Sequence, residues 1–372
     1  MKVSQTDSKL KFVYWFAHYN LASPSVRYRG KYPLKFLKDN FGICSYFVMP
    51  GYSPKAIWQF AKTYLSALFF CKADSIIVIQ RVNSNFIYAN LLKLLVKTRS
   101  HKTIYDLDDA DYLEYKPKSI WWFIKNCSAL MVGSNELYQN LSTYNKNVYL
   151  NTSPTPDLNI VKKNKNSVLT VGWIGCFGGH HKQSLLNLFF PALQHLPFKI
   201  NLVLLGVTDN SEIKFLVKYF SCFENVVLEM PQNMNWTNEN DIQLRIAKFD
   251  IGIATLIDNE LQRSKSAFKT KQYLNNGVPV LSSDIPENNL FVQHGKNGYL
   301  CATPDDFRNR IIEINEMNTE NYHLLSIAAR ETICNFNLPN YCNKLIEVFE
   351  KMQLSTLCPK TEEHTTFIDI GC

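Results

Sequence analysis

Residues 250–300 read DIGIATLIDNELQRSKSAFKTKQYLNNGVPVLSSDIPENNLFVQHGKNGYL, and this stretch decides the fold class. It predicts a buried strand, a polar loop, a short helix closed by Gly277, a second strand and a later glycine turn. Positions 261–283 hold no acidic residue, but the loop and helix start carry Arg263, Lys265, Lys269 and Lys271. A helix N-terminus already bears partial positive charge, so added cations favour a bound anion such as phosphate. A solvated basic helix face is the alternative that the charges alone leave open.

The same alternation of apolar runs with helical segments extends along the chain. The first half predicts strands at residues 10–17, 43–49, 75–80, 102–105, 129–132 and 147–150. The pattern restarts with strands at residues 168–174, 199–206, 226–230, 250–256 and 278–282. Because these runs are continuously apolar, helices should cover both faces of each sheet, as in parallel α/β proteins. The predicted fold class is α/β, with two tandem doubly wound Rossmann-like domains and an interdomain cleft.

The domain boundary is predicted from residues 151–166, NTSPTPDLNIVKKNKN, which are rich in Pro, Asn and Lys. We expect an N-terminal domain over residues 1–155 and a C-terminal domain over residues 156–337. A last amphipathic helix over residues 338–354 should pack back on the N-terminal domain. The polar remainder, residues 355–372, is expected to be a flexible tail.

Composition limits the class of partner. The net charge of +8 suits nucleic acid, an anionic membrane surface or phosphorylated small molecules. Neither an aromatic-basic RNA motif nor zinc-finger spacing occurs, so nucleic acid is not expected. The ten cysteines include no C-x-x-C pair, and reduced thiols in a cytoplasmic protein are expected. No apolar run suits a secretory signal or a membrane span, so membrane contact would be peripheral, at the inner face of the cell membrane.

Two polar loops follow predicted strands, where open α/β sheets bind ligands. In VGWIGCFGGHHK (residues 171–182), Gly175 and Gly178 allow close approach of the backbone to a ligand, and Lys182 can meet a phosphate. A plain tight turn explains this loop equally well. In IYDLDDADYLE (residues 104–114), Asp108 and Asp109 can hold a divalent metal, orient an acceptor hydroxyl or cap the next helix. We favour the acceptor interpretation over the metal one and assign no metal ligand.

Further loops are candidates for acceptor contacts. SPSVRYRGKYP (residues 23–33) carries Arg27 and Arg29, and Arg81 follows the third strand. VGSNELYQNL (residues 132–141) places Asn135 at a predicted helix start. Solvated surface charge is the alternative for the arginines, and helix capping is the alternative for Asn135.

Taken together, these motifs resemble the GT-B glycosyltransferases of the large retaining family called group 1 or family 4. The most specific match is R-x-K-x-x-[FY]-K-x-x-Q-Y-[ML]-x-x-G-x-P-V, which runs from Arg263 to Val280. Supporting matches are GWIG, FDIGI, HGKNGYL, PSVRYR, QR, YDLDDA and VGSN, and the resemblance covers roughly residues 10–350. The family's pattern has two glutamates eight apart, whereas this chain has Ser264 and Gln272 at the matching positions. Glutamine keeps one acceptor for a ribose hydroxyl, so ribose contact by Gln272 is still expected.

The resemblance implies a metal-independent hexosyltransferase-type enzyme that needs no cofactor. It would move a sugar, with retention, from a UDP- or GDP-sugar to a glycan or lipid-linked acceptor in cell-surface polysaccharide or lipopolysaccharide synthesis. The N-terminal domain would be the acceptor side and the C-terminal domain would bind the nucleotide sugar. The expected catalytic residues are Arg263, Lys265, Asp108 and Asp109. The expected donor-binding residues are Gly175, Gly178, Lys182, Lys269, Gln272 and Ser264, and the expected acceptor-binding residues are Arg27, Arg29, Arg81 and Asn135.

Two other functions stay open at this point. One is a nucleotide-sugar 2-epimerase-like enzyme of the same fold, which needs no separate acceptor. The other is a non-catalytic scaffold that only binds a sugar nucleotide, an alternative that Ser264 and Gln272 keep open.

Overall fold

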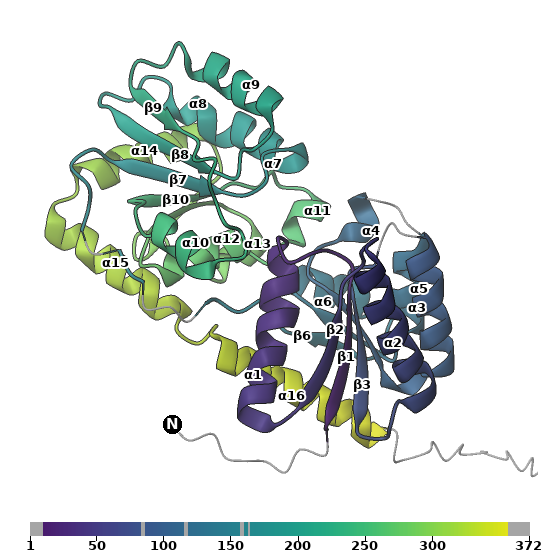
Figure 1. The fold of residues 1–372 in the computed structure, drawn as a ribbon. Coiled ribbons are helices and arrows are strands. Elements are labelled where there is room, and N and C mark those ends of the chain that lie inside the picture. The colour runs from purple at the N-terminus through teal and green to yellow at the C-terminus, as the bar shows by residue number, and fades with distance from the viewer. Residues whose placement is uncertain (1–9, 83–85, 115–117, 157–159, 163, 356–372) are drawn as a thin grey trace, which may run out of the picture.

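Two parallel six-stranded sheets form the framework of the molecule (Figure 1). The computed structural model describes residues 10–82, 86–114, 118–156, 160–162 and 164–355. The strand orders are β2-β1-β3-β4-β5-β6 and β12-β11-β10-β7-β8-β9. Each sheet reverses its direction of growth beside its first strand, which is the doubly wound arrangement. The predicted α/β fold class with two tandem doubly wound domains is therefore confirmed.

The first sheet is sandwiched between two helical layers. Its strands are β1 (Phe12–Ala17), β2 (Cys44–Val48), β3 (Ser75–Gln80), β4 (Thr103–Leu107), β5 (Ala129–Val132) and β6 (Val148–Leu150). Four helices pack on one face: α2 (Pro54–Phe70), α3 (Phe86–Thr98), α5 (Lys118–Asn126) and α6 (Asn135–Leu141). The other face is covered by α1 (Tyr32–Phe41) and by the C-terminal helix α16 (Leu338–Ser355), which crosses back beneath this domain in Figure 1. Shorter pieces are η1 (Val26–Lys31), η2 (Ser100–Lys102) and α4 (Asp111–Glu114).

The second domain repeats this plan. Its strands are β7 (Thr170–Ile174), β8 (Ile200–Leu205), β9 (Val226–Glu229), β10 (Ile251–Ala254), β11 (Val280–Ser283) and β12 (Gly298–Cys301). Its longer helices are α9 (Asn210–Phe220), α10 (Glu239–Ile246), α12 (Phe268–Asn275), α14 (Pro304–Glu316) and α15 (Thr319–Ile333). Shorter helical segments are α7 (Gly179–Ser184), η3 (Leu185–Phe189), α8 (Phe190–Leu193), α11 (Glu260–Arg263) and α13 (Pro286–Asn289).

Burial explains why the strands were recognisable in the sequence. The central strands β3, β4, β7 and β10 are buried at every position, and most of their residues are apolar. The edge strand β9 alternates between half-buried and exposed residues, as expected where one side of a sheet meets water. The glycine turn expected near residue 295 exists, with Gly295 at φ 78°, but the chain then pairs with β11 as strand β12. That strand is only four residues long, too short for its apolar pattern to stand out.

Two further observations concern the ends and the surface. Residues 356–372, which the sequence predicts to be a flexible tail, lie outside the described part of the chain. Among the residues that the structure describes, no helix is both long enough and apolar enough to span a bilayer.

Candidate functional site

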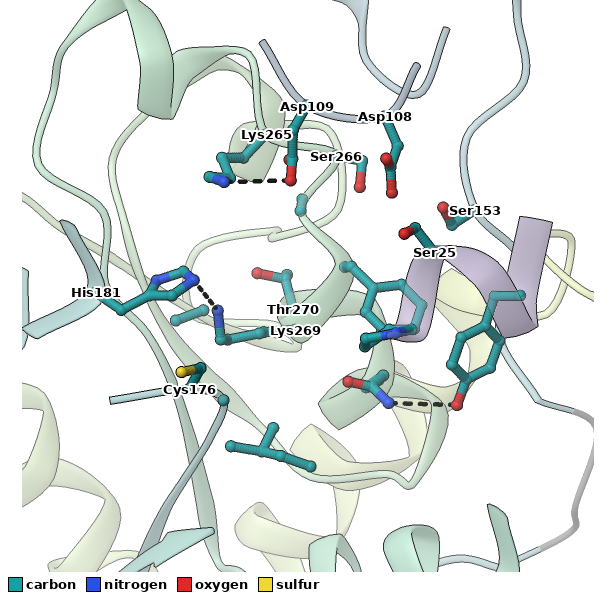
Figure 2. Close-up of a pocket in the computed structure, with 18 of the residues that line it drawn as sticks. Ser25, Asp108, Asp109, Ser153, Cys176, His181, Lys265, Ser266, Lys269 and Thr270 are labelled. Atoms are coloured by element: carbon teal, nitrogen blue, oxygen red, sulfur yellow. Dashed lines mark hydrogen bonds and ion pairs between the residues drawn. The ribbon is translucent and has the colours of Figure 1, made fainter. Parts of the chain in front are cut away.

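A cavity of about 300 Å³ lies between the two domains, at the carboxyl ends of both sheets. The first domain lines it with loops that follow β1, β3 and β4, and the second with the loops after β7 and β10 and the start of α12. Figure 2 shows Ser25, Asp108 and Asp109 facing Lys265, Ser266 and Thr270 across this space. Loops at the carboxyl ends of parallel strands are the usual ligand site of such sheets. The cavity therefore lies where the fold class predicts a substrate.

Helix α12 is fixed against the second sheet by close packing. The Tyr273 hydroxyl donates to the Ile253 carbonyl at 3.1 Å and accepts from the Ile174 amide at 3.1 Å. A Cβ atom on Gly252 would lie 2.3 Å from the Tyr273 ring, so only glycine admits this ring against β10. Tyr273 thus joins α12 to both β7 and β10, and the N-terminus of the helix is held at the cavity.

The N-terminus of α12 presents backbone N–H groups to the cavity. Ala267, its N-cap residue, has φ 48° and provides no side-chain hydrogen bond to the first turn. The next residues, Phe268, Lys269 and Thr270, all line the cavity. N–H groups at a helix start need a partner from outside the helix, and the helix dipole favours an anionic one. Together with Lys265 and Lys269, this terminus forms an anion-binding wall.

Lys269 is an unusual lysine because it is half-buried in this wall with no carboxylate of the described residues directly against it. Its Nζ atom lies 3.3 Å from Nε2 of His181 and 5.8 Å from the centre of the Trp173 ring. Burial, with the nearby charge of Lys265, lowers the pKa of Lys269 to about 7. The same two effects, burial and the neighbouring lysines, hold the pKa of His181 well below its ordinary value. Lys269 is therefore poised to take up a proton when an anion arrives.

Because Gly175 has no side chain, it leaves space for a ligand beside Lys269. A Cβ atom there would lie 2.9 Å from the Trp173 ring and 3.0 Å from Cε of Lys269. Its φ of 157° is also a value that residues with a side chain rarely adopt. The loop after β7 can thus bring its backbone up to the floor of the cavity.

The opposite wall is a network of charges around Arg81. Its guanidinium pairs with Asp108 at 3.1 Å, with Asp109 at 3.3 Å and with Asp111 at 2.6 Å. Arg81 has φ 50°, a strained backbone conformation of the kind found at functional sites. Lys265 reaches across the cleft to Asp109 at 3.3 Å, so this network joins the two domains.

The two neighbouring aspartates titrate differently. Burial raises the pKa of Asp108 to about 6, although the charge of Arg81 acts in the opposite direction. Burial also acts to raise the pKa of Asp109, but Lys265 and Arg81 outweigh it and hold that pKa well below its ordinary value. Environments that separate the pKa values of two adjacent carboxyls are characteristic of functional sites.

A second contact between the domains closes the other end of the cavity. The Tyr28 hydroxyl donates to Glu239, and the Gln272 amide donates to the Tyr28 hydroxyl at 3.5 Å. The Tyr28 ring packs against Phe268 with 4.7 Å between the ring centres. Gln272 is buried and lines the cavity, about one turn beyond the start of α12.

Eight of the predicted site residues line this cavity and six do not. The eight are Lys265, Asp108, Asp109, Gly175, Lys269, Gln272, Arg27 and Arg81. They come from six separate loops or helices, so only the tertiary fold brings them together.

Arg263, predicted to be catalytic, and Lys182, predicted to bind the donor, are not among the residues that line the cavity. Arg263 ends α11 with its side chain 47% exposed, and its Nη2 atom donates to Asp258 at 2.9 Å. Lys182 forms an ion pair with Glu212 at 2.7 Å, away from the cavity lining. Both residues are on short helices that direct these side chains away from the cleft.

The other four residues outside the lining have structural contacts. Arg29 is fully buried and chelates Asp106, and its Nη1 atom donates to the Asn151 carbonyl at 2.6 Å. Asn135 donates to Glu287 through both its main chain and its side chain. The Ser264 carbonyl accepts a hydrogen bond from Ser134 at 2.7 Å, which ties the domains together. Gly178 caps α7, and nothing lies within 4 Å of where its Cβ would be.

Sequence reasoning missed several residues of the lining. Tyr28 stands between Arg27 and Arg29, and the sequence analysis assigned it no role. Thr255 directly follows β10, and its hydroxyl is buried without a hydrogen-bond partner among the described residues. The carboxyl-end rule for parallel strands was the signal that could have found Thr255. His181 also lines the cavity and faces Lys269 (Figure 2).

Comparison with known proteins adds information on the fold. No family model matches the sequence, and no curated protein matches it. A glycosyltransferase from Rickettsia africae is 14% identical with a TM-score of 0.59, over 92% of this chain and 98% of that one. Sucrose-phosphate synthase from Thermosynechococcus elongatus is 10% identical with a TM-score of 0.67, over 93% of this chain and 100% of that one. Anabaena HepE, solved in complex with UDP and glucose, is 13% identical with a TM-score of 0.63, over 92% of this chain and 100% of that one. Since the likeness covers both domains, the chain has the two-domain α/β fold of these structures, the GT-B fold.

Proposed function

We propose that this protein is a glycosyltransferase that moves a sugar from a nucleotide sugar to a hydroxyl group of a glycan or lipid-linked acceptor. One observation carries the proposal: the uncapped start of α12, with Lys265 and Lys269, faces a cavity between two Rossmann-like domains. The residues 156–337 would bind the donor and residues 1–155 the acceptor. Each wall of the cavity supports one part of this assignment.

The donor diphosphate would lie on the α12 wall. Its oxygens would accept from the free N–H groups of the first helical turn, and the two lysines would balance their charge. When the glycosidic bond breaks, negative charge grows on the leaving nucleoside diphosphate. Fixed dipoles and cations at that place stabilise the charged transition state more than the bound substrate, which is what accelerates the reaction. Lys265 is the residue we assign to this role, with Lys269 beside it.

The nucleoside would extend along α12 toward Gln272. Its carboxamide is buried at the far end of the cavity, where it offers one acceptor and one donor to a ribose. The structure of HepE holds UDP and glucose, which makes UDP-hexoses the first donors to test. GDP-sugars, which the sequence also suggested, are the second.

The acceptor would lie on the wall formed by the first domain. Asp108 lines the cavity with a carboxyl group whose raised pKa of about 6 leaves it ionised at neutral pH. An ionised carboxylate accepts a hydrogen bond from a hydroxyl group and so can orient the acceptor oxygen toward the sugar. Arg81 fixes that carboxylate, and Arg27, buried on η1, also lines the cavity.

Three finer parts of the proposal rest on the resemblance of residues 263–280 alone. They are retention of configuration, charge stabilisation by the cations of this chain without a bound metal, and a role in cell-surface polysaccharide or lipopolysaccharide synthesis. We expect such an enzyme to act in the cytoplasm, at the inner face of the cell membrane, where lipid-linked acceptors are held.

Calorimetry with UDP and GDP tests whether the protein binds the nucleotide part of the donor. We expect one of them to bind with a stoichiometry of one, and Lys265→Ala to weaken it, because that lysine lines the α12 wall. Incubation with UDP-glucose and a membrane extract, with and without EDTA, tests whether the protein transfers the sugar. Release of UDP with labelled glucose on a glycan or lipid, insensitive to EDTA, is expected. Failure of both nucleotides to bind would overturn the proposal, and conversion of the donor to an epimer without acceptor would replace it.

A further inference from the structure

A second cavity, of about 380 Å³, lies where the chain passes between the two domains, and we call it the hinge cavity. Asn151 and Thr152, which follow β6 of the first domain, line one part of it. The other lining residues belong to the segment between α15 and α16 and to the start of α16. In Figure 1 the chain passes there from α15 of the second domain to α16, which packs on the first. Pockets that hold small ligands measure roughly 300–1,000 Å³, so this cavity is large enough for one.

The two segments that connect the domains are paired beside this cavity. The chain passes between the domains after β6 and again after α15. Thr155 and Asn337 form a parallel β-bridge, and the Thr155 amide donates to the Phe336 carbonyl at 2.8 Å. Any change in the angle between the domains must bend these segments. A ligand in the hinge cavity would contact both of them and so favour one angle.

Carboxamides dominate the lining of the hinge cavity. Five of its ten lining residues are asparagines, at positions 151, 335, 337, 340 and 343. The side chains of Asn151, Asn337 and Asn340 donate to backbone carbonyls of the protein. Within the described part of the chain, the side chains of Asn335 and Asn343 form no hydrogen bond. These two amides are therefore available to a ligand.

The chemistry of the lining fits a neutral saccharide. An amide group offers a donor and an acceptor, and a sugar hydroxyl does the same, so the two groups pair well. An apolar ligand would leave the amides unpaired, which costs free energy. Lys344 and Glu347 of the lining have opposite charges, so the cavity does not favour an ion of either sign. Phe336, which is half-buried in the lining, offers an aromatic surface to the C–H groups of a sugar ring.

Lys271 connects the hinge cavity to the interdomain cavity described above. It is fully buried on α12, between Thr270 and Gln272 of the interdomain lining, but it does not line that cavity itself. Its Nζ atom donates to the Thr152 hydroxyl at 2.5 Å and to the Ser153 carbonyl at 2.9 Å. Thr152 lines the hinge cavity and Ser153 lines the interdomain cavity. One buried lysine thus holds two consecutive residues that face different cavities.

Phe336 provides a second connection between the two cavities. Its ring packs edge-on against Phe291, with 5.0 Å between the ring centres. The Nζ atom of Lys271 lies 5.2 Å from the centre of the Phe291 ring. Helix α12, which carries Lys271, begins at the anion-binding wall. A shift of the hinge residues can therefore reach that wall through packed side chains and a helix.

We propose that the hinge cavity binds a neutral saccharide, and that the bound saccharide strengthens nucleotide binding in the interdomain cavity. Asn335, Asn343 and the Thr152 hydroxyl would hold it, which joins residues 335–337 to the first domain. That contact would favour the domain angle of this structure, in which Lys265 reaches Asp109 across the cleft. The saccharide is a free sugar or the end of a glycan chain, since both present the same hydroxyl groups. The site is separate from the donor and acceptor positions of the proposed function.

Saturation-transfer NMR without nucleotide tests saccharide binding. The probes are glucose, galactose, mannose and N-acetylglucosamine as free sugars, and maltose and cellobiose as short glycans. We expect at least one probe to bind the unaltered protein. The double variant Asn335→Ala, Asn343→Ala should lose at least roughly tenfold in affinity, because two hydrogen bonds are removed. Binding of the disaccharides alone would identify the ligand as a glycan end, and binding of a monosaccharide would identify it as a free sugar.

Matched controls remove carboxamides elsewhere. Asn126→Ala on α5 and Asn321→Ala on α15 change exposed asparagines outside both linings, and saccharide affinity should stay unchanged. Lys265→Ala should also leave it unchanged, because that lysine lines the interdomain cavity. Asn335 is exposed and Asn343 half-buried, so the midpoint of thermal unfolding of the double variant should match that of the unaltered protein.

Calorimetric titration with UDP, in the presence and absence of a saturating amount of the saccharide, tests the coupling. We expect the saccharide to raise UDP affinity roughly fivefold or more, and UDP to raise saccharide affinity by the same factor. Thr152→Val keeps the shape of the side chain but removes the hydroxyl that accepts from Lys271. In that variant, at saccharide saturation, most of the increase in UDP affinity should be lost.

Two results would overturn the proposal. One is that no probe binds, or that the double variant binds it as well as the unaltered protein and the controls do. The other is an unchanged UDP affinity when the saccharide is saturating. These outcomes differ from a failure of the proposed function, in which UDP would not bind although the saccharide signal still depends on Asn335 and Asn343.

Discussion

Replacing Lys269 by methionine should stabilise the protein and weaken its binding of UDP at the same time. The lysine is half-buried beside His181 and Trp173, and loss of solvation, with the nearby charge of Lys265, lowers its pKa to about 7 from the ordinary value of 10.5. In the unfolded chain this lysine stays protonated up to its ordinary pKa. Between the two pKa values the unfolded state therefore binds more protons than the folded state, so the free energy of unfolding rises with pH through this window. Below the lower pKa the full free-energy cost of burying the charged lysine is present.

The size of both effects can be worked from the structure. Each unit of pKa shift corresponds to about 1.4 kcal/mol, so at about pH 8 the buried lysine costs on the order of 3 kcal/mol. Methionine has a similar length and no charge, so Lys269→Met should recover much of that free energy. A charged hydrogen bond to the diphosphate contributes roughly 1.5–3 kcal/mol, so its loss should weaken UDP binding by about 10- to 100-fold. In the unaltered protein, UDP affinity should fall as the pH rises above about 7, because binding requires the protonated lysine.

Urea unfolding at about pH 8 and calorimetric titration with UDP measure the two effects. Lys265→Met is the informative comparison, because Lys265 pairs with Asp109 at 3.3 Å instead of being buried without a carboxylate. That variant should lose UDP affinity and also lose stability, by roughly 1–3 kcal/mol. Lys182→Met, outside the cavity, should leave UDP affinity unchanged. The reasoning is refuted if Lys269→Met unfolds at a lower urea concentration than the unaltered protein, or if it binds UDP equally well.

Three other predictions follow from the walls of the cavity. Gly175→Ala should weaken UDP binding at least roughly tenfold in calorimetry, because the new methyl group would meet the Trp173 ring and Lys269 and shift the cavity floor. Normal affinity in that variant would show that the floor does not contact the nucleotide. Arg263→Ala should leave UDP affinity within about twofold, since its side chain is exposed outside the lining, and a large loss would mean that the arginine swings into the site. Asp108→Asn should lower kcat by roughly 10- to 100-fold in a transfer assay while UDP affinity stays the same. Transfer by the unaltered protein should rise with pH through about 6 as this carboxyl ionises, and a profile flat through that range would contradict its role.

The sequence alone determined the layered α/β architecture, and it predicted an anion site in the second domain. Continuous apolar runs such as Ser75–Gln80 predict strands because both faces of a parallel sheet are buried, and that requirement is local. Lys265 and Lys269 beside a helix start predict an anion site for a similar reason, since the helix dipole acts within one turn.

Only the tertiary structure decided which of the neighbouring charges face the cavity. Arg263 and Lys265 are two positions apart in one motif, yet the first ends α11 in solvent and the second pairs with Asp109 of the other domain. Arg29 and Arg27 differ in the same way, because the winding of η1 directs one into the core onto Asp106. The direction of a side chain depends on its position around the helix or turn that carries it. The residue with which it pairs lies in a distant part of the sequence. The surroundings that lower the pKa of Lys269, among them Trp173 and His181, also come together only in the folded domain.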